Sequence, residues 1–232
     1  MIKVIPAKDR HFNDFGWLKA HWLFSFDSYR DPNNMHFGSL RVFNDDTVDG
    51  GQGFPPHPHA EMEIVTLVLS GAVTHSDSMG NKTVIRAGDV QRMTAGTGVT
   101  HSEFNFENEP LHLYQIWIMP DTKGQKPSYE QKTTRLTDLK NQIRAVASST
   151  PNGSDMVTLN TDASIYLSNP EAGQELRFEN PRKRRLFLYV TDGSLEVNGV
   201  GLGKNDQGRI ESEESLQIKA KTDSRFIIVE VA

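Results

Sequence analysis

Short runs of apolar and β-branched residues recur along the whole chain, and clusters of Gly, Asn, Asp and Pro separate them. Runs of this length between turn-forming residues are typical of the strands of an all-β sandwich or barrel. The clearest runs are residues 63–69, 72–75, 111–119, 186–190 and 226–231. The pattern therefore predicts an all-β fold of short strands, with a hairpin turn at residues 77–81 between two of them.

One segment departs from the strand pattern. Apolar residues at the spacing of one helical face occur in residues 136–147, at Leu136, Leu139, Ile143 and Val146. A polar stretch follows at residues 148–153 and suits a linker. At this length two domains are expected. We place them as an N-terminal barrel over residues 1–135, a helix and linker over 136–153, and a C-terminal barrel over 154–232.

The two halves share a rhythm but not their chemistry. Residues 67–73 and residues 188–197 each combine a strand, a glycine and a second strand, which favours two related barrels. All eight histidines lie before residue 113, and none follows His112. We therefore expect the C-terminal barrel to be a degenerate copy without a metal site.

Composition narrows the possible chemistry. The chain has no cysteine, so any metal must be held by nitrogen and oxygen. Its net charge of −5 argues against direct binding to nucleic acid. The apolar runs are too short to span a bilayer, and the first residues lack the apolar core of a secretory signal. We expect a cytoplasmic protein with no membrane partner.

Two pairs of potential metal ligands are each spaced two residues apart: His57 with His59, and His101 with Glu103. Residues at this spacing in a strand point to the same face, so both members of a pair can reach one ion. Pairs on neighbouring strands would offer three nitrogens and one carboxylate, which suit a divalent ion such as iron, manganese, copper, nickel or zinc. Glu63 has the same strand parity as the first two histidines, so spacing alone leaves the carboxylate ligand open.

The residues around these pairs resemble the two cupin motifs. Residues 51–71 resemble the first motif, in which two histidines and a downstream glutamate precede a glycine. Residues 88–101 resemble the second motif, which ends on a further histidine. The resemblance implies antiparallel β-barrels of the jelly-roll type.

The resemblance narrows to pirin, a bicupin family, and to its short bacterial members over roughly residues 1–130. It is carried by the segments His57-Pro58-His59, Glu61-Met62-Glu63-Ile64-Val65-Thr66, Asp77-Ser78-Met79-Gly80-Asn81, Met93-Thr94-Ala95-Gly96-Thr97-Gly98, His101-Ser102-Glu103 and Leu113-Tyr114-Gln115-Ile116-Trp117-Ile118. Membership would imply one divalent metal on His57, His59, His101 and Glu103, with iron the first expectation and manganese, copper, nickel, cobalt or zinc as alternatives. It favours Glu103 over Glu63 as the carboxylate ligand. Glu61 and Glu63 then become candidates for orienting the ligating imidazoles.

The resemblance also implies a reaction. Many pirin-like proteins are similar to quercetin 2,3-dioxygenases, which open the central ring of a flavonol with dioxygen and release carbon monoxide. The partners would be a flavonol-like molecule and O2, and Glu103 would accept the flavonol proton. A non-enzymatic, metal-dependent regulatory protein with a protein partner is the alternative. A sugar isomerase is a third possibility and would need a polar, basic pocket.

The remaining histidines are expected to be structural. His75 and His112 have strand neighbours and are expected to line or support the barrel. His11, His21 and His36 lie in an N-terminal region rich in aromatic residues, which are expected in the core.

Overall fold

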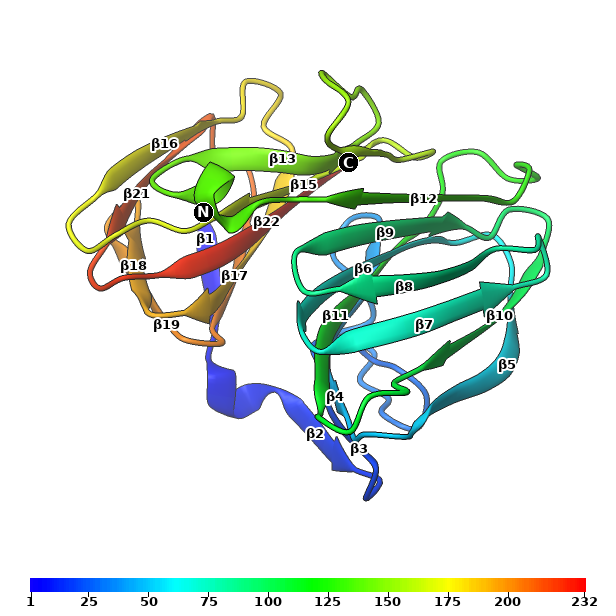
Figure 1. The fold of residues 1–232 in the computed structure, drawn as a ribbon. Helices are drawn as coiled ribbons and strands as arrows, with labels where there is room; N and C mark the ends of the chain where they lie inside the picture. The colour runs from blue at the N-terminus through cyan, green and yellow to red at the C-terminus, as the bar shows by residue number, and fades with distance from the viewer. The chain divides into compact units, whose positions relative to one another are not determined.

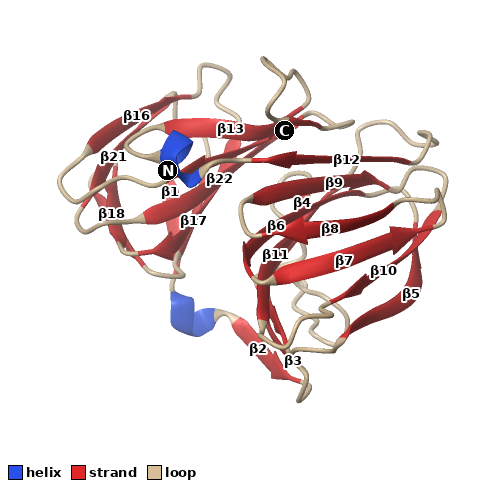
Figure 2. Ribbon diagram, viewed as in Figure 1, coloured by secondary structure: helices blue, strands red, loops and turns tan.

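The structure is a computed structural model that describes residues 1–232, apart from the side chain of Leu136. Almost all regular structure is β-strand, in agreement with the sequence expectation (Figures 1 and 2). No helix among the described residues is long and apolar enough to cross a membrane. The chain divides into two compact units. We call residues 11–134 with 149–162 the N-unit, and residues 1–10 with 135–148 and 163–232 the C-unit.

The N-unit is built from two antiparallel sheets. One has the strand order β12-β9-β6-β11-β4-β3-β2, and the other has the order β5-β10-β7-β8. Their bounds are β2 (His11–Asp14), β3 (Leu18–Trp22), β4 (Leu40–Val48), β5 (Gly53–His59), β6 (Glu63–Ser70), β7 (Ala72–Asp77), β8 (Lys82–Arg86), β9 (Asp89–Thr94), β10 (Val99–Phe104), β11 (Leu111–Ile118) and β12 (Ser128–Thr133), with β14 (Val157–Thr158) in the returning segment. Apolar side chains of both sheets share one core cluster, which includes Val68 and Leu111 from the larger sheet and Val73 and Ile85 from the smaller.

The C-unit repeats this architecture. One sheet contains the order β1-β20-β17-β22-β15-β13, and the other has the order β16-β21-β18-β19. The elements are β1 (Ile2–Ile5), η1 (Ala7–Asp9), η2 (Leu136–Leu139), β13 (Ile143–Ser148), β15 (Ala163–Ser168), β16 (Glu175–Glu179), β17 (Arg185–Asp192), β18 (Ser194–Val197), β19 (Val200–Gly203), β20 (Gln207–Ile210), β21 (Ser215–Ala220) and β22 (Arg225–Val231). An apolar cluster that includes Leu188, Val197, Ile218 and Ile228 fills the space between the two sheets.

The helix expected over residues 136–147 is wrong. Only one 3₁₀ turn, η2, is present, and residues 143–148 form strand β13 against β15. The pairing shifts register between Ala145 and Ala147, so Val146 is an extra residue in the ladder. A bulge of this kind interrupts the two-residue alternation. The apolar residues of this strand therefore do not follow the simple alternation by which a strand is recognised.

Each unit contains a segment that the sequence analysis had assigned outside it. Strand β1, at the start of the sequence, pairs with β20 in the C-unit, with Ile2 opposite Ile210. Residues 149–162, which follow β13, belong to the N-unit. There the backbone N–H of Asn160 donates to Oε1 of Glu63 at 2.8 Å. Each unit is therefore assembled from segments that are not contiguous in sequence.

Arg92 on β9 ties the returning segment to the N-unit sheet. It is 5% exposed, and its Nε donates to the carbonyl oxygen of Thr158 at 2.8 Å. One guanidinium nitrogen also donates to Oγ of Ser128 at 2.6 Å. The Nε atom lies 3.8 Å from Oε1 of Glu63, whose side chain is also buried. Arg92 therefore supplies the positive charge beside a buried carboxylate.

Replacing Arg92 with Met should lower the free energy of unfolding by about 3–5 kcal/mol, because a buried carboxylate loses its cation. Adding Glu63→Gln should recover part of this loss, since a neutral amide needs no cation. Urea denaturation measures both changes. Lys219→Ala, which breaks an exposed ion pair with Glu175, is the control and should leave the transition in place. An Arg92→Met protein that unfolds with the wild type would contradict this account of the network.

Candidate metal centre

Three adjacent strands, β5, β10 and β7, carry the candidate ligands. On one side of β10, His101 lies opposite His57 of β5. On the other side, His101 lies opposite Asp77 of β7, and Glu103 lies opposite His75. The two pairs of candidate ligands therefore occupy neighbouring strands, which was the condition for them to meet, and a third strand adds two more polar side chains.

Strand β5 is shaped for this position by its prolines and by a glycine. It lies at the edge of its sheet, and its register shifts beside Pro55 and Pro56, so its prolines stand where a strand tolerates them. The register against β10 shifts between His101 and Glu103, so β5 contributes one extra residue there. A Cβ at Gly53 would lie 2.3 Å from the carbonyl oxygen of Glu103, so the close approach of the strands requires glycine.

The three predicted histidines converge. Potential ligand atoms of His57, His59 and His101 all lie within 4.8 Å of one another. In a second group, potential ligand atoms of His101, Glu103 and His75 also lie within 4.8 Å of one another. His57 and His59 are partly exposed, whereas His101 and Glu103 are buried. The cluster thus has a solvent-facing side and a buried side.

Hydrogen bonds leave suitable nitrogens for a metal. Nδ1 of His57 lies 2.8 Å from the carbonyl oxygen of Pro55 and must donate to it, which leaves a lone pair on Nε2. Nδ1 of His101 lies 3.4 Å from Nδ1 of His75. Nε2 of His101 is buried and has no hydrogen-bond partner among the described residues. A buried nitrogen of this kind needs a partner, and a divalent ion fits it.

Burial keeps the imidazoles of His59 and His101 neutral. Desolvation, with the nearby histidines, lowers the pKa of His101 to about 2. Desolvation and His57 lower the pKa of His59 to about 4. Metal binding requires the neutral form of histidine. At neutral pH these two rings therefore offer lone pairs without first losing a proton.

Glu103 is held by a short chain of hydrogen bonds. Its two carboxylate oxygens accept from Nε2 of Gln115 at 3.1 and 2.9 Å. The amide oxygen of Gln115 accepts from Nε1 of Trp117 at 3.1 Å, which fixes the orientation of the amide. Burial raises the pKa of Glu103 to about 7. The carboxyl group can therefore hold or release a proton near neutral pH.

Gln115 belongs to a row of polar side chains inside the barrel. Asn44 of β4, Gln115 of β11, Thr66 of β6 and Gln91 of β9 are successive register partners across the larger sheet. Register partners point to the same face, and Gln115 reaches Glu103 of the opposite sheet. All four residues are at most 9% exposed. The interior beneath the histidines is therefore polar.

The other two glutamates weighed from the sequence contact different groups. Glu63 accepts from the hydroxyl of Thr94 at 2.6 Å and from the backbone of Asn160. Glu61 accepts from the backbone N–H of Gly124. Neither belongs to the two ligand groups found among the described residues. Both carboxylates are engaged in holding loops of the N-unit.

Sequence reasoning missed the roles of His75 and Asp77. His75 was expected only to line or support the barrel, and Asp77 was assigned to a turn. Nε2 of His75 lies 2.9 Å from Oδ2 of Asp77, and both side chains are fully buried. The available signal was spacing, since His75 and Asp77 are two residues apart, as are His57 and His59. Gln115 gave no comparable signal, because its link to Glu103 depends on packing between sheets.

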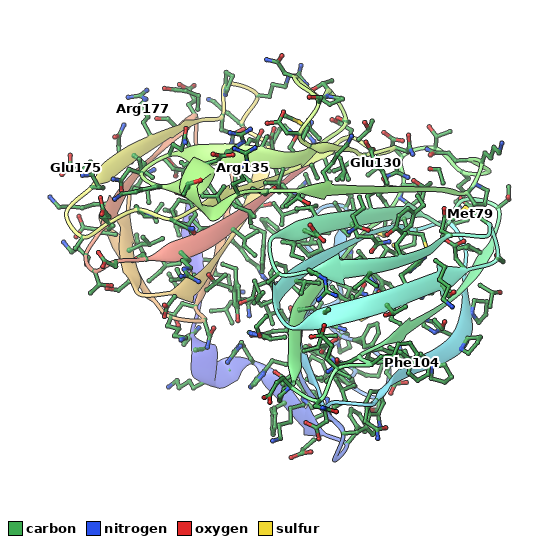
Figure 3. All side chains as sticks on the ribbon, viewed as in Figure 1. Met79, Phe104, Glu130, Arg135, Glu175 and Arg177 are labelled. Atoms are coloured by element: carbon green, nitrogen blue, oxygen red, sulfur yellow. The ribbon has the colours of Figure 1, made fainter. Side chains whose placement is uncertain are left out.

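An open cavity of about 400 Å³ adjoins the cluster. His59 and Thr100 contribute to its wall, together with Ser78 from the turn after β7. Met79, labelled in Figure 3, lies at the tip of this turn. The volume lies in the range of about 300–1,000 Å³ that is typical of small-molecule sites. The exposed side of the cluster can therefore receive a small molecule.

Comparison with known proteins gives concordant matches along the chain. Residues 6–118 match the family described as "Pirin", and residues 145–231 match "Quercetinase C-terminal cupin domain". A "Pirin-like protein" of Caulobacter vibrioides is 42% identical over 219 residues, or 94% of each chain. A "Quercetin 2,3-dioxygenase" of Escherichia coli is 39% identical, covering 100% of this chain and 99% of its own. The crystal structure of "bacterial pirin YhhW in complex with nickel(II)" from Escherichia coli matches with a TM-score of 0.93 at 39% identity, over 100% of this chain and 99% of that chain. These similarities confirm the expected two-barrel cupin fold.

The raised pKa of Glu103 predicts a pH-dependent stability in metal-free protein. Between its usual value of 4.5 and about 7, folded Glu103 keeps a proton that the unfolded chain has released. The free energy of unfolding must therefore fall as pH rises through this window, by about 3 kcal/mol in total. Glu103→Gln removes the titrating group. As pH rises through the window, the free energy of unfolding of this variant should therefore increase by this amount relative to that of wild type. Urea denaturation below and above the window tests this, and a constant difference between the proteins would contradict it.

Proposed function

The chain belongs to the pirin family, and from this premise we propose that it is a metal-dependent dioxygenase that cleaves flavonols such as quercetin. The reaction is a 2,3-dioxygenation, in which one O2 is consumed and one carbon monoxide leaves the ring. One observation carries the proposal: three imidazoles converge, one of them, His59, in the wall of a cavity of about 400 Å³, and Nε2 of His101 is buried without a hydrogen-bond partner among the described residues. The names of the relatives from Escherichia coli support the choice of substrate.

We propose His57, His59, His101 and Glu103 as the ligands of one divalent ion. The donor set of three nitrogens and one oxygen leaves open positions on an ion that takes five or six ligands. Iron is the first candidate, and manganese, copper, nickel, cobalt or zinc would also fit these donors. When bound, the ion would supply Lewis acidity toward the flavonol oxygen and a redox partner for dioxygen.

Glu103 is the proposed proton acceptor. Its carboxylate lies beside His101, so a flavonol bound at the cluster would bring its 3-hydroxyl within reach. Gln115 holds both carboxylate oxygens and limits their movement. The proton taken from the substrate hydroxyl would stay on a Glu103 oxygen during ring opening and return to the product. The buried position of Glu103 keeps bulk water from competing for it.

With iron, manganese, copper, nickel or cobalt supplied, the protein should consume quercetin and O2 in equal amounts and lose this activity on chelation. Free flavonols oxidise slowly and bind metals themselves, so the background must contain the same total metal. His101→Ala protein provides this background, because it lacks the buried ligand. Equal depletion rates for wild type and His101→Ala with every metal would exclude quercetinase activity, and a metal-dependent binding role would replace it.

Metal analysis tests the ligand set independently of turnover. Elemental analysis should find one tightly bound divalent ion per chain, because the C-unit has no histidine. His57→Ala, His59→Ala, His101→Ala and Glu103→Gln should each reduce occupancy strongly. Glu63→Gln should keep the metal, since Glu63 binds Thr94 and Asn160. Retention of metal in Glu103→Gln and its loss in Glu63→Gln would reverse the assignment of the carboxylate ligand.

A further inference from the structure

A continuous set of side-chain contacts leads from the turn after β7 to the buried ligand His101. Oδ2 of Asp77 lies 2.9 Å from Nε2 of His75. The other nitrogen of that ring, Nδ1, lies 3.4 Å from Nδ1 of His101. His75 and Asp77 are fully buried, and His101 is 3% exposed. The three side chains are therefore shielded from competing water.

The turn holds the carboxylate of Asp77 in place. Its Oδ1 accepts from the backbone N–H groups of Met79 and Asn81 at 2.9 and 3.0 Å. Its Oδ2 accepts from Nδ2 of Asn81 at 2.8 Å as well as from His75. Tyr129 packs on the ring of His75 with centroids 5.0 Å apart. Neither the carboxylate nor the ring is free to turn away.

The proton positions along this chain follow from hydrogen-bond chemistry. A carboxylate only accepts, so the single N–H of a neutral His75 must be on Nε2. Its Nδ1 then carries a lone pair and accepts, so His101 must carry its own N–H on Nδ1. The lone pair of His101 is left on Nε2, the nitrogen that has no partner among the described residues. The opposite tautomer of His101 would place a proton on this nitrogen and block a metal bond.

We propose that Asp77 and His75 are positioning residues that select the metal-binding tautomer of His101 and fix the orientation of its ring. This inference rests on the metal site of the proposed function. The carboxylate determines which nitrogen of His75 carries the proton, and His75 in turn determines which nitrogen of His101 carries it. The hairpin turn at residues 77–81 is thereby part of the metal centre, although none of its residues is a proposed ligand.

Asp77→Asn should reverse the direction of the hydrogen bonds that link residue 77, His75 and His101, while the backbone of the turn keeps its shape. The amide oxygen can still accept from the backbone N–H groups of Met79 and Asn81, whereas the amide N–H now donates to Nε2 of His75, and Nδ2 of Asn81 loses its acceptor. The proton of His75 then moves to Nδ1, and that of His101 moves to Nε2. An aspartate-to-asparagine exchange beside a catalytic histidine has the same effect on a tautomer in serine proteases.

His75→Phe provides a different perturbation. It keeps an aromatic ring in place but removes the acceptor for Nδ1–H of His101, so the tautomer of His101 is no longer selected. Asp77→Asn should therefore be the more harmful change for metal binding, since it enforces the wrong tautomer. A purely structural role would give the opposite order, because His75 is the more central side chain.

The test uses full-length, metal-free protein labelled with ¹⁵N. Long-range ¹H–¹⁵N spectra distinguish protonated from unprotonated ring nitrogens, and His101→Gln identifies the signals of His101. Wild type should show an unprotonated Nε2, Asp77→Asn a protonated one, and His75→Phe a mixture. Glu63→Gln is the matched control, because it makes the same acid-to-amide change in a buried side chain of the N-unit, and it should resemble wild type.

Titration with nickel(II) alone gives the second readout. Asp77→Asn should weaken nickel binding about 10–100-fold, as is usual when a partner of a ligating histidine is lost. His75→Phe should weaken it less, and Glu63→Gln should leave it unchanged. An unprotonated Nε2 of His101 in Asp77→Asn, or nickel affinity equal to wild type, would overturn the inference. Neither measurement uses quercetin, so a failure of the proposed reaction is recorded separately.

Discussion

β10 is hydrogen-bonded to β5 on one side and to β7 on the other, and this double pairing determines which side chains of the neighbouring strands His101 can touch. His101 is on the middle one of three strands, so it meets the partly exposed His57 on one side and the buried side chains of His75 and Asp77 on the other. Glu103, two residues on, points to the same interior and meets Gln115 of the opposite sheet. The open and the closed side of the centre follow from this single register.

The sequence predicted those features that depend on strand parity. His57 with His59, and His101 with Glu103, are spaced for one face, and the structure places them on paired strands. The sequence could not predict that β7 is the strand on the other side of β10. The contribution of His75 depends on that pairing, which joins residues 26 positions apart. The prediction of a helix failed for a local reason. A bulge at Val146 interrupts the alternation of apolar and polar residues by which a strand is recognised.

The N-unit carries buried polar groups around the candidate metal centre, and these groups reduce its stability. An apolar cluster fills the space between the two sheets of the C-unit. The N-unit has its own apolar cluster and, in addition, buries Asn44, Thr66, Gln91 and Gln115 in one row. Desolvation, with Asp45 and Glu103 nearby, raises the pKa of Asp46 well above its usual value. Polar groups of this kind reduce stability, and they are concentrated where the ligands need orientation and protons.

The exchange of segments between the units sets a limit on how this architecture can be cut and recombined. A crossover in the gene at residue 135 would deliver an N-terminal module without residues 149–162, so Arg92 would lose the carbonyl of Thr158. It would also carry β1 away from β20. Neither half of the sequence therefore contains a whole unit, and a cut between them would damage both barrels.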